Sequence, residues 1–297
     1  MFRGLSAFPL TPFKDEQIDL AALAVLVQRL VASGVDSLGI LGSTGSYAYL
    51  DKPQRKAVLR EAIRHAGTVP VIAGVGALRT RDALELALDA QQAGAAGLLL
   101  APVSYQPLND DEVFALYETV CRAVSLPVCV YDNPGTTHFR FSDALHARIA
   151  ALPHIASIKI PGVPASQADA NERVARLRAL IPAHVSIGIS GDASAARGLN
   201  AGCEVWYSVI GGLFPEAAQH ITRLALAGQA QQAQAASDRL QPLWTLFDKH
   251  GGSIRVVASA AARLGLASED CLPSPLQTLS GQARTELAAV LAHTQLA

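Results

Sequence analysis

The sequence predicts a parallel (β/α)8 barrel, the TIM-barrel architecture, followed by a helical extension, and three observations favour this fold. Eight short apolar segments bounded by glycine and proline alternate with longer segments of helical periodicity. The apolar character of these segments on both faces is typical of strands covered by helices. Eight even units favour a closed barrel over an open sheet, and no Gly-x-Gly-x-x-Gly signature opens the first helix. The expected strands are Leu5–Pro9, Ser37–Leu41, Pro70–Gly74, Gly97–Ala101, Pro127–Tyr131, Ile155–Ile160, Val185–Ser190 and Val205–Val209.

The first three helices have recognisable ends. Asp19 is the expected N-cap of the first helix, and Gly34 lies just past its end. Pro53 stands near the start of the second helix, where a missing N–H costs nothing. The third helix is expected from about Thr80 to Ala93, with Gly94 ending it. These ends place the helices between the expected strands.

The pattern changes after residue 227. An Ala/Gln tract from Gly228 to Ala236 is followed by apolar residues at helical spacing and by no further strand candidate. We therefore predict a catalytic barrel over residues 1–227 and, over residues 228–297, a helical extension packed on the barrel.

Composition excludes several classes of protein. The net charge is −1, so no basic excess is available to neutralise the phosphates of a nucleic acid. The four cysteines are scattered and the histidines lack ligand spacing, so no metal site is expected. No apolar run approaches the length of a membrane span, and the N-terminus does not resemble a signal peptide. These features predict a cytoplasmic protein that uses neither membrane nor nucleic acid.

Residues Gly42 to Ser46 follow the second expected strand, at the barrel face where catalytic groups gather. Small residues such as Gly45 let backbone N–H groups approach a ligand, and Ser43 and Thr44 add hydroxyls. Such a loop suits a carboxylate or a phosphate. An ordinary turn has the same composition, and for this loop alone the turn is the simpler interpretation.

Two further strand ends carry reactive groups. Tyr131 ends the fifth expected strand, where a phenol can transfer protons, although an aromatic that only packs there is common. Lys159 lies between isoleucines in the sixth strand. Burial favours its neutral amine, a nucleophile toward carbonyls, unless the side chain extends to solvent. An amine, a phenol and an anion-binding loop at one face predict imine chemistry on a 2-oxo acid.

Five motifs in this order resemble the dihydrodipicolinate synthase / N-acetylneuraminate lyase family of class I pyruvate-dependent aldolases, over nearly the whole chain. The tail over residues 253–276 is also similar to the family's C-terminal helices. The motifs are Phe8-Pro9-Leu10-Thr11-Pro12-Phe13, Gly42-Ser43-Thr44-Gly45, Tyr131-Asp132-Asn133-Pro134, Lys159 and Ser190-Gly191-Asp192.

The resemblance implies a role for each site residue. It makes Lys159 the Schiff-base lysine and Tyr131 the proton shuttle, while Ser43 and Thr44 bind the substrate carboxylate. It places the backbone carbonyl of Tyr207 in the site. It also implies that no cofactor is needed beyond the covalent imine, and that the chain forms a homotetramer built as a dimer of dimers.

The sequence departs from the family where the second substrate is chosen. Thr136 stands where dihydrodipicolinate synthases carry an arginine for that substrate's carboxylate. The interface tyrosine of the family falls at Ser104, with Tyr105 one step along. Asp192 is a candidate for binding a substrate hydroxyl or for capping a helix, and Ala193 follows it where N-acetylneuraminate lyases have a second acid. The pyruvate half of the site is retained, while the partner half has diverged.

We therefore expect a Schiff-base lyase or aldolase acting on pyruvate or a related 2-oxo acid, with an aldehyde as partner. Its substrate would be a 2-keto-3-deoxy sugar acid or another 4-hydroxy-2-oxo acid. The nearest alternative is 4-hydroxy-tetrahydrodipicolinate (dihydrodipicolinate) synthase of lysine biosynthesis. Two rivals remain: a phosphosugar isomerase that holds phosphate at Gly211 and Gly212, and a non-catalytic 2-oxo-acid binding protein.

Overall fold

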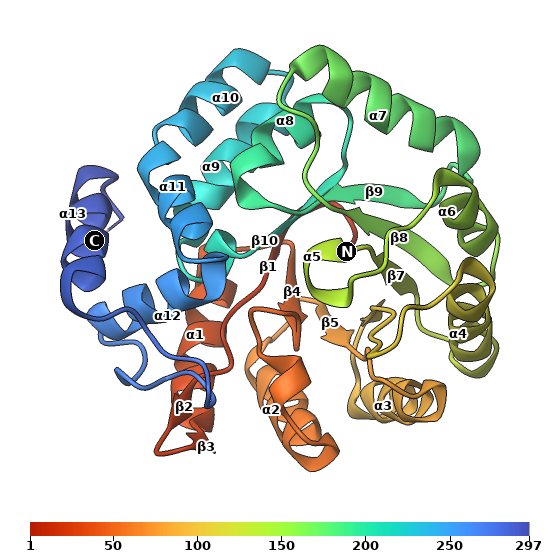
Figure 1. Ribbon diagram of the computed structural model, residues 1–297, viewed down its shortest axis with the longest axis horizontal. Helices are drawn as coiled ribbons and strands as arrows, with labels where there is room; N and C mark the ends of the chain where they lie inside the picture. The colour runs from red at the N-terminus through yellow and green to blue at the C-terminus, as the bar shows by residue number, and fades with distance from the viewer. Residues whose placement is uncertain (297) are drawn as a thin grey trace.

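The computed structural model describes residues 1–296 and shows eight parallel strands closed into a barrel inside a ring of helices (Figure 1). Consecutive strands pair in parallel, and the first strand closes the barrel by pairing with both the second and the last. The predicted barrel is confirmed. Its strands are β1 (Gly4–Ala7), β4 (Ser37–Ile40), β5 (Val71–Gly74), β6 (Gly97–Leu100), β7 (Val128–Tyr131), β8 (Ile155–Ile160), β9 (Ser186–Ile189) and β10 (Val205–Ser208).

The helices begin and end where the sequence signals predict. The Asp19 carboxylate accepts a hydrogen bond from the N–H of Ala22, and Gly34 and Gly94 adopt left-handed φ values of 76° and 92°. The third helix has the predicted bounds. The barrel helices are α1 (Leu20–Ser33), α2 (Lys52–His65), α3 (Thr80–Ala93), α4 (Asp110–Ala123), α6 (Asp143–Ala150), α7 (Gln167–Leu180), α8 (Ala195–Asn200) and α9 (Pro215–Leu226).

Short elements in the loops escaped the sequence analysis, because two to four residues are too few to show a period. A hairpin of β2 (Phe13–Lys14) and β3 (Gln17–Ile18) precedes α1. The helical turns η1 (Tyr47–Tyr49), α5 (Pro134–Thr137), η2 (Asp192–Ser194) and η3 (Ile210–Gly212) follow β4, β7, β9 and β10. These turns shape the loops of the catalytic face.

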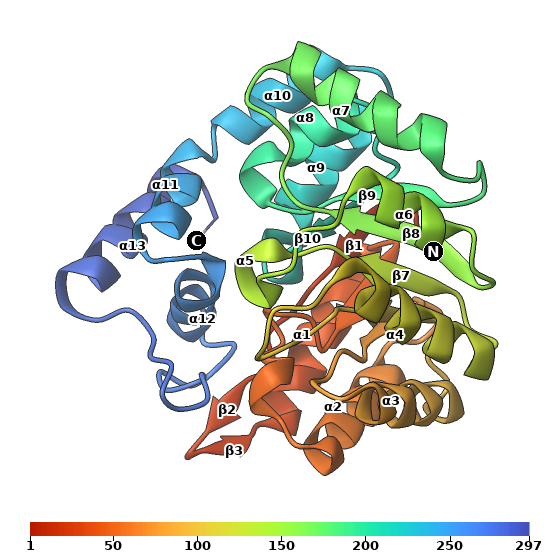
Figure 2. The ribbon, with the colours of Figure 1, turned by 45° about the vertical axis from the view of Figure 1, so that its right-hand side comes forward.

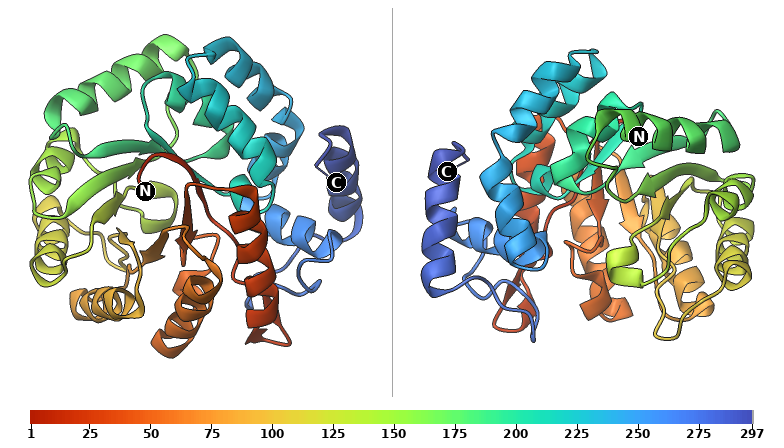
Figure 3. Two further views of the ribbon diagram at one scale, coloured as in Figure 1. Left: turned by 180° about the vertical axis from the view of Figure 1, so that it is seen from behind. Right: turned by 45° about the horizontal axis from the view of Figure 1, so that its top comes forward.

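The C-terminal helices lie against one side of the barrel (Figures 2 and 3). The first of them packs on α9, and the residues before the last helix reach the hairpin, where the N–H of Phe13 donates to the carbonyl of Cys271 over 3.1 Å. The helices are α10 (Ala230–Asp238), α11 (Gln241–Lys249), α12 (Ser253–Arg263) and α13 (Gly281–His293). No helix within residues 1–296 has the length and apolarity to cross a membrane.

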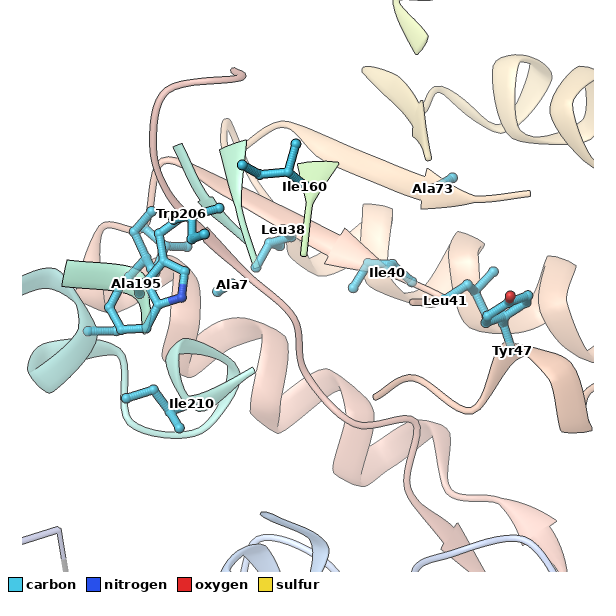
Figure 4. Packing of buried hydrophobic residues seen from close by; sticks show 14 of the residues in the cluster. Ala7, Leu38, Ile40, Leu41, Tyr47, Ala73, Ile160, Ala195, Trp206 and Ile210 are labelled. Carbon is cyan, nitrogen blue, oxygen red and sulfur yellow. The ribbon is translucent and has the colours of Figure 1, made fainter. Parts of the chain in front are cut away.

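Two apolar clusters stabilise the fold. The larger lies mainly between the strands and the helices, and Figure 4 shows Leu38, Ile160 and Trp206 among its residues. The smaller fills the barrel and contains Phe8, Tyr131 and Tyr207. Each buried aromatic of this size removes on the order of 150–250 Å2 from water. The inner cluster therefore gives the catalytic end of the barrel aromatic walls.

Candidate active site

Lys159 lies near the end of β8 with only 4% of its surface exposed. Its Nζ is 4.2 Å from the ring centre of Tyr131, 4.3 Å from that of Phe8 and 5.6 Å from that of Tyr207. Ring faces attract an amine of this kind and limit its movement. The three rings thus hold Nζ in one place at the catalytic end of the barrel.

Strand register sets this arrangement. Lys159 pairs with Tyr131 on β7 and with Gly188 on β9. A Cβ at Gly188 would lie 2.2 Å from Cε2 of Tyr207, so only glycine leaves room for that ring. The missing side chain on β9 allows Tyr207 to stand beside the lysine.

The phenol oxygen of Tyr131 joins two loops. Tyr131 Oη is 3.0 Å from Ser43 Oγ in the loop after β4. The side-chain amide of Asn133 donates to Tyr131 Oη over 3.0 Å and to Ser43 Oγ over 3.4 Å. The structure therefore brings together the predicted amine, phenol and serine hydroxyl, with Asn133 as an added member. A connected set of this kind can move a proton to or from a group bound on Lys159.

The loop after β4 is held in a strained backbone conformation. Leu41 has φ 61°, and Ser46 has φ 54°. For residues other than glycine such angles cost about 1–3 kcal/mol each. Gly74 on β5 makes this path possible, because a Cβ there would lie 1.9 Å from the carbonyl oxygen of Leu41. Figure 4 labels Leu41 and Tyr47, which stand at the two ends of the loop. In this conformation Ser43 lies opposite Tyr131.

Tyr47 and Arg55 support this loop from behind. The Arg55 guanidinium lies 5.1 Å from the ring centre of Tyr47 and donates to the carbonyls of Gly74 and Gly76. Burial lowers the pKa of Arg55 to about 10. Burial also raises the pKa of the Tyr47 phenol, and the nearby Tyr131 adds to that rise. Tyr47 therefore keeps its proton.

Tyr207 has a different role from Tyr131. Its Oη lies 2.6 Å from Ser157 Oγ, and the Cys129 thiol donates to it over 3.3 Å, inside the barrel. Complete burial raises the pKa of the Tyr207 phenol well above its ordinary value. The Tyr207 side chain forms a wall of the site. The contribution of its backbone carbonyl stays a prediction.

Other predicted residues occupy varied environments. The Asp192 carboxylate is buried and accepts hydrogen bonds from the Trp206 indole, the Ser208 hydroxyl and two backbone N–H groups after β10. These contacts tie η2 to β10. Thr44 and Gly45 lie in the Ser43 loop, with Thr44 buried. The binding roles of all three stay predictions.

The partner half of the predicted site is open. Thr136 is exposed on α5, and its hydroxyl donates to the carbonyl of Asn133 over 3.4 Å. Tyr105 is 90% exposed in the loop after β6. Neither is among the side chains that enclose Lys159, and their part in substrate binding stays a prediction.

The phosphate interpretation of Gly211 and Gly212 has a structural alternative. The N–H of Gly211 donates to Ser208 Oγ over 2.9 Å, so this donor is used within the protein. A Cβ at Gly212 would lie 2.2 Å from the carbonyl oxygen of Phe8. Gly212 thus lets the chain turn closely against the backbone of Phe8, whose ring is one of the walls around Lys159.

Metal ligation has no visible basis in the described part of the chain. Within residues 1–296, no group of three or more His, Cys, Asp or Glu side chains is placed to hold an ion. A groove of about 1090 Å3 runs between α9 and α13, lined in part by His220 and His293, and shares no residue with the Lys159 cluster. The cluster is the better candidate site, because it holds a nucleophile and a proton-transfer group together.

The comparison with known families agrees with this geometry. The model of the dihydrodipicolinate synthetase family matches residues 1–294. The chain belongs to this family. Its members are lyases of the class I aldolase type, so the chain is an enzyme, as predicted.

Individual relatives cover almost the full length of this family member. A 4-hydroxy-tetrahydrodipicolinate synthase of Phenylobacterium zucineum is 31% identical over 299 residues, covering 98% of this chain and 97% of its own. The crystal structure of a dihydrodipicolinate synthase from Agrobacterium tumefaciens has a TM-score of 0.94 and 43% identity, covering 99% and 98% of the two chains. A dihydrodipicolinate synthase from Acinetobacter baumannii complexed with pyruvate has a TM-score of 0.90 and 26% identity, covering both chains completely.

Three site residues were missed by the sequence analysis as functional groups. Phe8 was quoted only as part of a motif, Asn133 only as a neighbour of Tyr131, and Tyr47 was not singled out. An asparagine two residues after a strand-end tyrosine was the available signal for a side chain facing that phenol. Nothing in the sequence indicated that Phe8 and Tyr47 lie near Lys159 and Tyr131, because these contacts depend on barrel closure.

Proposed function

We propose that this family member is a 4-hydroxy-tetrahydrodipicolinate synthase that binds pyruvate covalently on Lys159 and joins it to aspartate semialdehyde. The observation that carries the proposal is the enclosed amine of Lys159 beside the Tyr131–Ser43 pair. The comparisons support this synthase more strongly than the general 2-oxo-acid aldolase expected first.

The proposed chemistry proceeds through an imine on Lys159. Neutral Nζ of Lys159 adds to the ketone carbon of pyruvate, and loss of water from the adduct gives an imine. The protonated imine draws electrons from the methyl carbon, which releases a proton to become an enamine. The enamine carbon then forms a bond to the aldehyde carbon, whose oxygen takes up a proton. The amino group of the aspartate semialdehyde unit then adds to the imine carbon and displaces Lys159, which closes the ring of the product and restores the free amine.

Tyr131 is placed to carry protons in these steps. Its ring centre lies 4.2 Å from Nζ, and its oxygen contacts Ser43 in the loop predicted to hold the substrate carboxylate. General acid–base catalysis of this kind contributes about 10²–10⁴-fold in rate. The residues that hold pyruvate and move its protons thus come from β8, β7 and the loop after β4.

A second candidate function rests on Thr136. The threonine is neutral where dihydrodipicolinate synthases carry an arginine, and its exposed hydroxyl suits a hydroxyl-bearing partner better than a carboxylate. We therefore keep the cleavage or synthesis of a 2-keto-3-deoxy sugar acid, or of another 4-hydroxy-2-oxo acid, as the alternative.

One assay separates the two candidates. Purified protein is mixed with pyruvate and aspartate semialdehyde, and loss of both is followed by proton NMR, with Lys159→Ala as the control. Equal consumption of the two substrates by the wild type alone supports the synthase. Pyruvate bound on Lys159 without consumption of aspartate semialdehyde would contradict it and move the search to hydroxylated aldehydes.

Assembly, cofactor need and location belong to the same proposal. We expect a homotetramer built as a dimer of dimers, active in the cytoplasm without metal or organic cofactor. Light scattering tests the assembly. Activity assays before and after chelation test the need for a metal. A fully active monomer, or activity lost to a chelator and restored by metal, would contradict them.

A further inference from the structure

The side chain of Asn133 does not cap the helix that follows it. Asn133 is the N-cap of α5, a position where asparagine ordinarily accepts a hydrogen bond from the backbone of the first turn. Its side chain makes no cap hydrogen bond here. The backbone carbonyl of Asn133 accepts from the N–H groups of Thr136 and Thr137 at 3.0 Å, so the turn forms without the side chain. The amide is therefore free for another role.

That amide faces the catalytic phenol. Asn133 Nδ2 lies 3.0 Å from Tyr131 Oη and 3.4 Å from Ser43 Oγ, so the three polar groups form a triangle. Figure 1 shows α5, which directly follows Asn133, over the middle of the barrel. Tyr131 is 4% exposed, so water has little access to compete for its oxygen. An amide donor in such a site acts strongly on a neighbouring charge.

We propose that Asn133 is a positioning residue for the phenol of Tyr131. This inference rests on the proposed function, in which Tyr131 is the proton shuttle. The amide N–H donates to Oη and occupies one of its lone pairs. The phenol proton must then point toward Ser43 or the substrate. When the proton leaves, the same N–H stabilises the phenolate oxygen. Asn133 thereby makes the proton easier to release without touching the substrate's reacting atoms.

Other ionisable groups also face Tyr131 and stay constant in the experiment. Lys159 lies under its ring from β8, and Tyr47 lies near it in η1. Tyr117 on α4 lies next to its backbone, and Asp132 follows it in sequence. Substitutions at Asn133 leave all four in place, so a change in Tyr131 titration would report the lost amide.

The test uses Asn133→Asp, Asn133→Ala and a matched asparagine. Aspartate has the same shape but cannot donate when ionised, and alanine removes the group. The control is Asn109→Ala: Asn109 caps α4, its side chain accepting from the Glu112 N–H over 2.9 Å. For each protein we would measure kcat and KM for pyruvate against pH, the ultraviolet titration of tyrosinate with Tyr131→Phe subtracted, and the urea midpoint.

The two asparagines should give opposite results. Both Asn133 variants should lose about tenfold or more in kcat. A tenfold loss corresponds to about 1.4 kcal/mol, the contribution of one hydrogen bond. Their KM for pyruvate should change little, and the Tyr131 titration midpoint should rise by about one pH unit. The urea midpoint should stay near that of the wild type. Asn109→Ala should instead lower the urea midpoint and leave kcat and the titration unchanged.

Two results would overturn the proposal. Wild-type kcat and titration in Asn133→Asp would show that no donated N–H is needed. A lowered urea midpoint in Asn133→Ala with an unchanged titration would show that Asn133 serves only α5. The tyrosinate titration needs no substrate, so it separates failure of this inference from failure of the proposed function, which would appear as a wild-type protein that never binds pyruvate.

Discussion

Gly188 is the position where the smallest added group should do the most harm. A Cβ there would stand 2.2 Å from Cε2 and 2.8 Å from Cδ2 of Tyr207, and ordinary contact begins at 3.4 Å. The ring would have to retreat by about 1.2 Å, the difference between 3.4 and 2.2 Å. Tyr207 is 1% exposed and bonded to Ser157 over 2.6 Å, so it has no free space to enter. Overpacking costs about 1–3 kcal/mol, and breaking the Ser157 bond adds about 1–3 kcal/mol.

We therefore expect Gly188→Ala to lose about 2–6 kcal/mol of unfolding free energy, the sum of the two ranges. It should also slow imine formation on Lys159, because Tyr207 is one of the walls around that lysine. Urea denaturation and the rate of borohydride trapping with pyruvate measure the two effects. Gly135→Ala is the stability control, since a Cβ there meets only Asn133 Oδ1 at 3.8 Å. That change should be neutral or stabilise by about 0.4–1 kcal/mol. A Gly188→Ala protein as stable and as reactive as the wild type would refute the packing argument.

Three other changes test the site and its support. Ser43→Ala should reduce kcat about tenfold by removing one partner of Tyr131, while Ser43→Thr should stay within a few-fold; equal rates for all three proteins would show that the hydroxyl is idle. Asp192→Ala should cost at least about 3 kcal/mol in urea denaturation, because four donors lose their acceptor. Burial raises the pKa of the Asp192 carboxyl despite those hydrogen bonds. Its stabilising effect is therefore complete at acidic pH and declines as pH rises through the raised pKa. A difference in unfolding free energy between wild type and Asp192→Ala that grows with pH would contradict this sign. The His146 imidazole and the Asp132 carboxylate are buried 3.4 Å apart. A double-mutant cycle with Asp132→Asn and His146→Leu should therefore give a coupling of about 0.5–3 kcal/mol in unfolding free energy, and additive effects would contradict the contact.

The barrel and the meeting of Tyr131 with Lys159 were predictable from local signals. Apolar strands, helix caps such as Asp19 and the lysine between isoleucines each carry their meaning within a few residues. Parallel strands end at one face of the barrel, so the sequence also predicted that Tyr131 and Lys159 would meet. The register of β7 and β8, which pairs these two residues directly, confirmed that inference.

The remaining features depend on contacts between distant segments. Phe8 reaches Lys159 only because β1 and β10 close the barrel, and no short-range pattern indicates that contact. Asn133 faces a phenol and does not cap its own helix, because Ser43 and Tyr131 lie within reach of its amide. Hairpin β2–β3 has too few residues to be recognised before the structure shows its partner.

Covalent capture on Lys159 tests the central claim most directly. The protein is mixed with pyruvate, reduced with borohydride, weighed intact and digested to locate the added group. The account predicts one adduct per chain on Lys159, absent from Lys159→Ala and slowed in Tyr131→Phe. A folded protein that stays unmodified with pyruvate in large excess, or that carries its adduct on another lysine, would contradict the account.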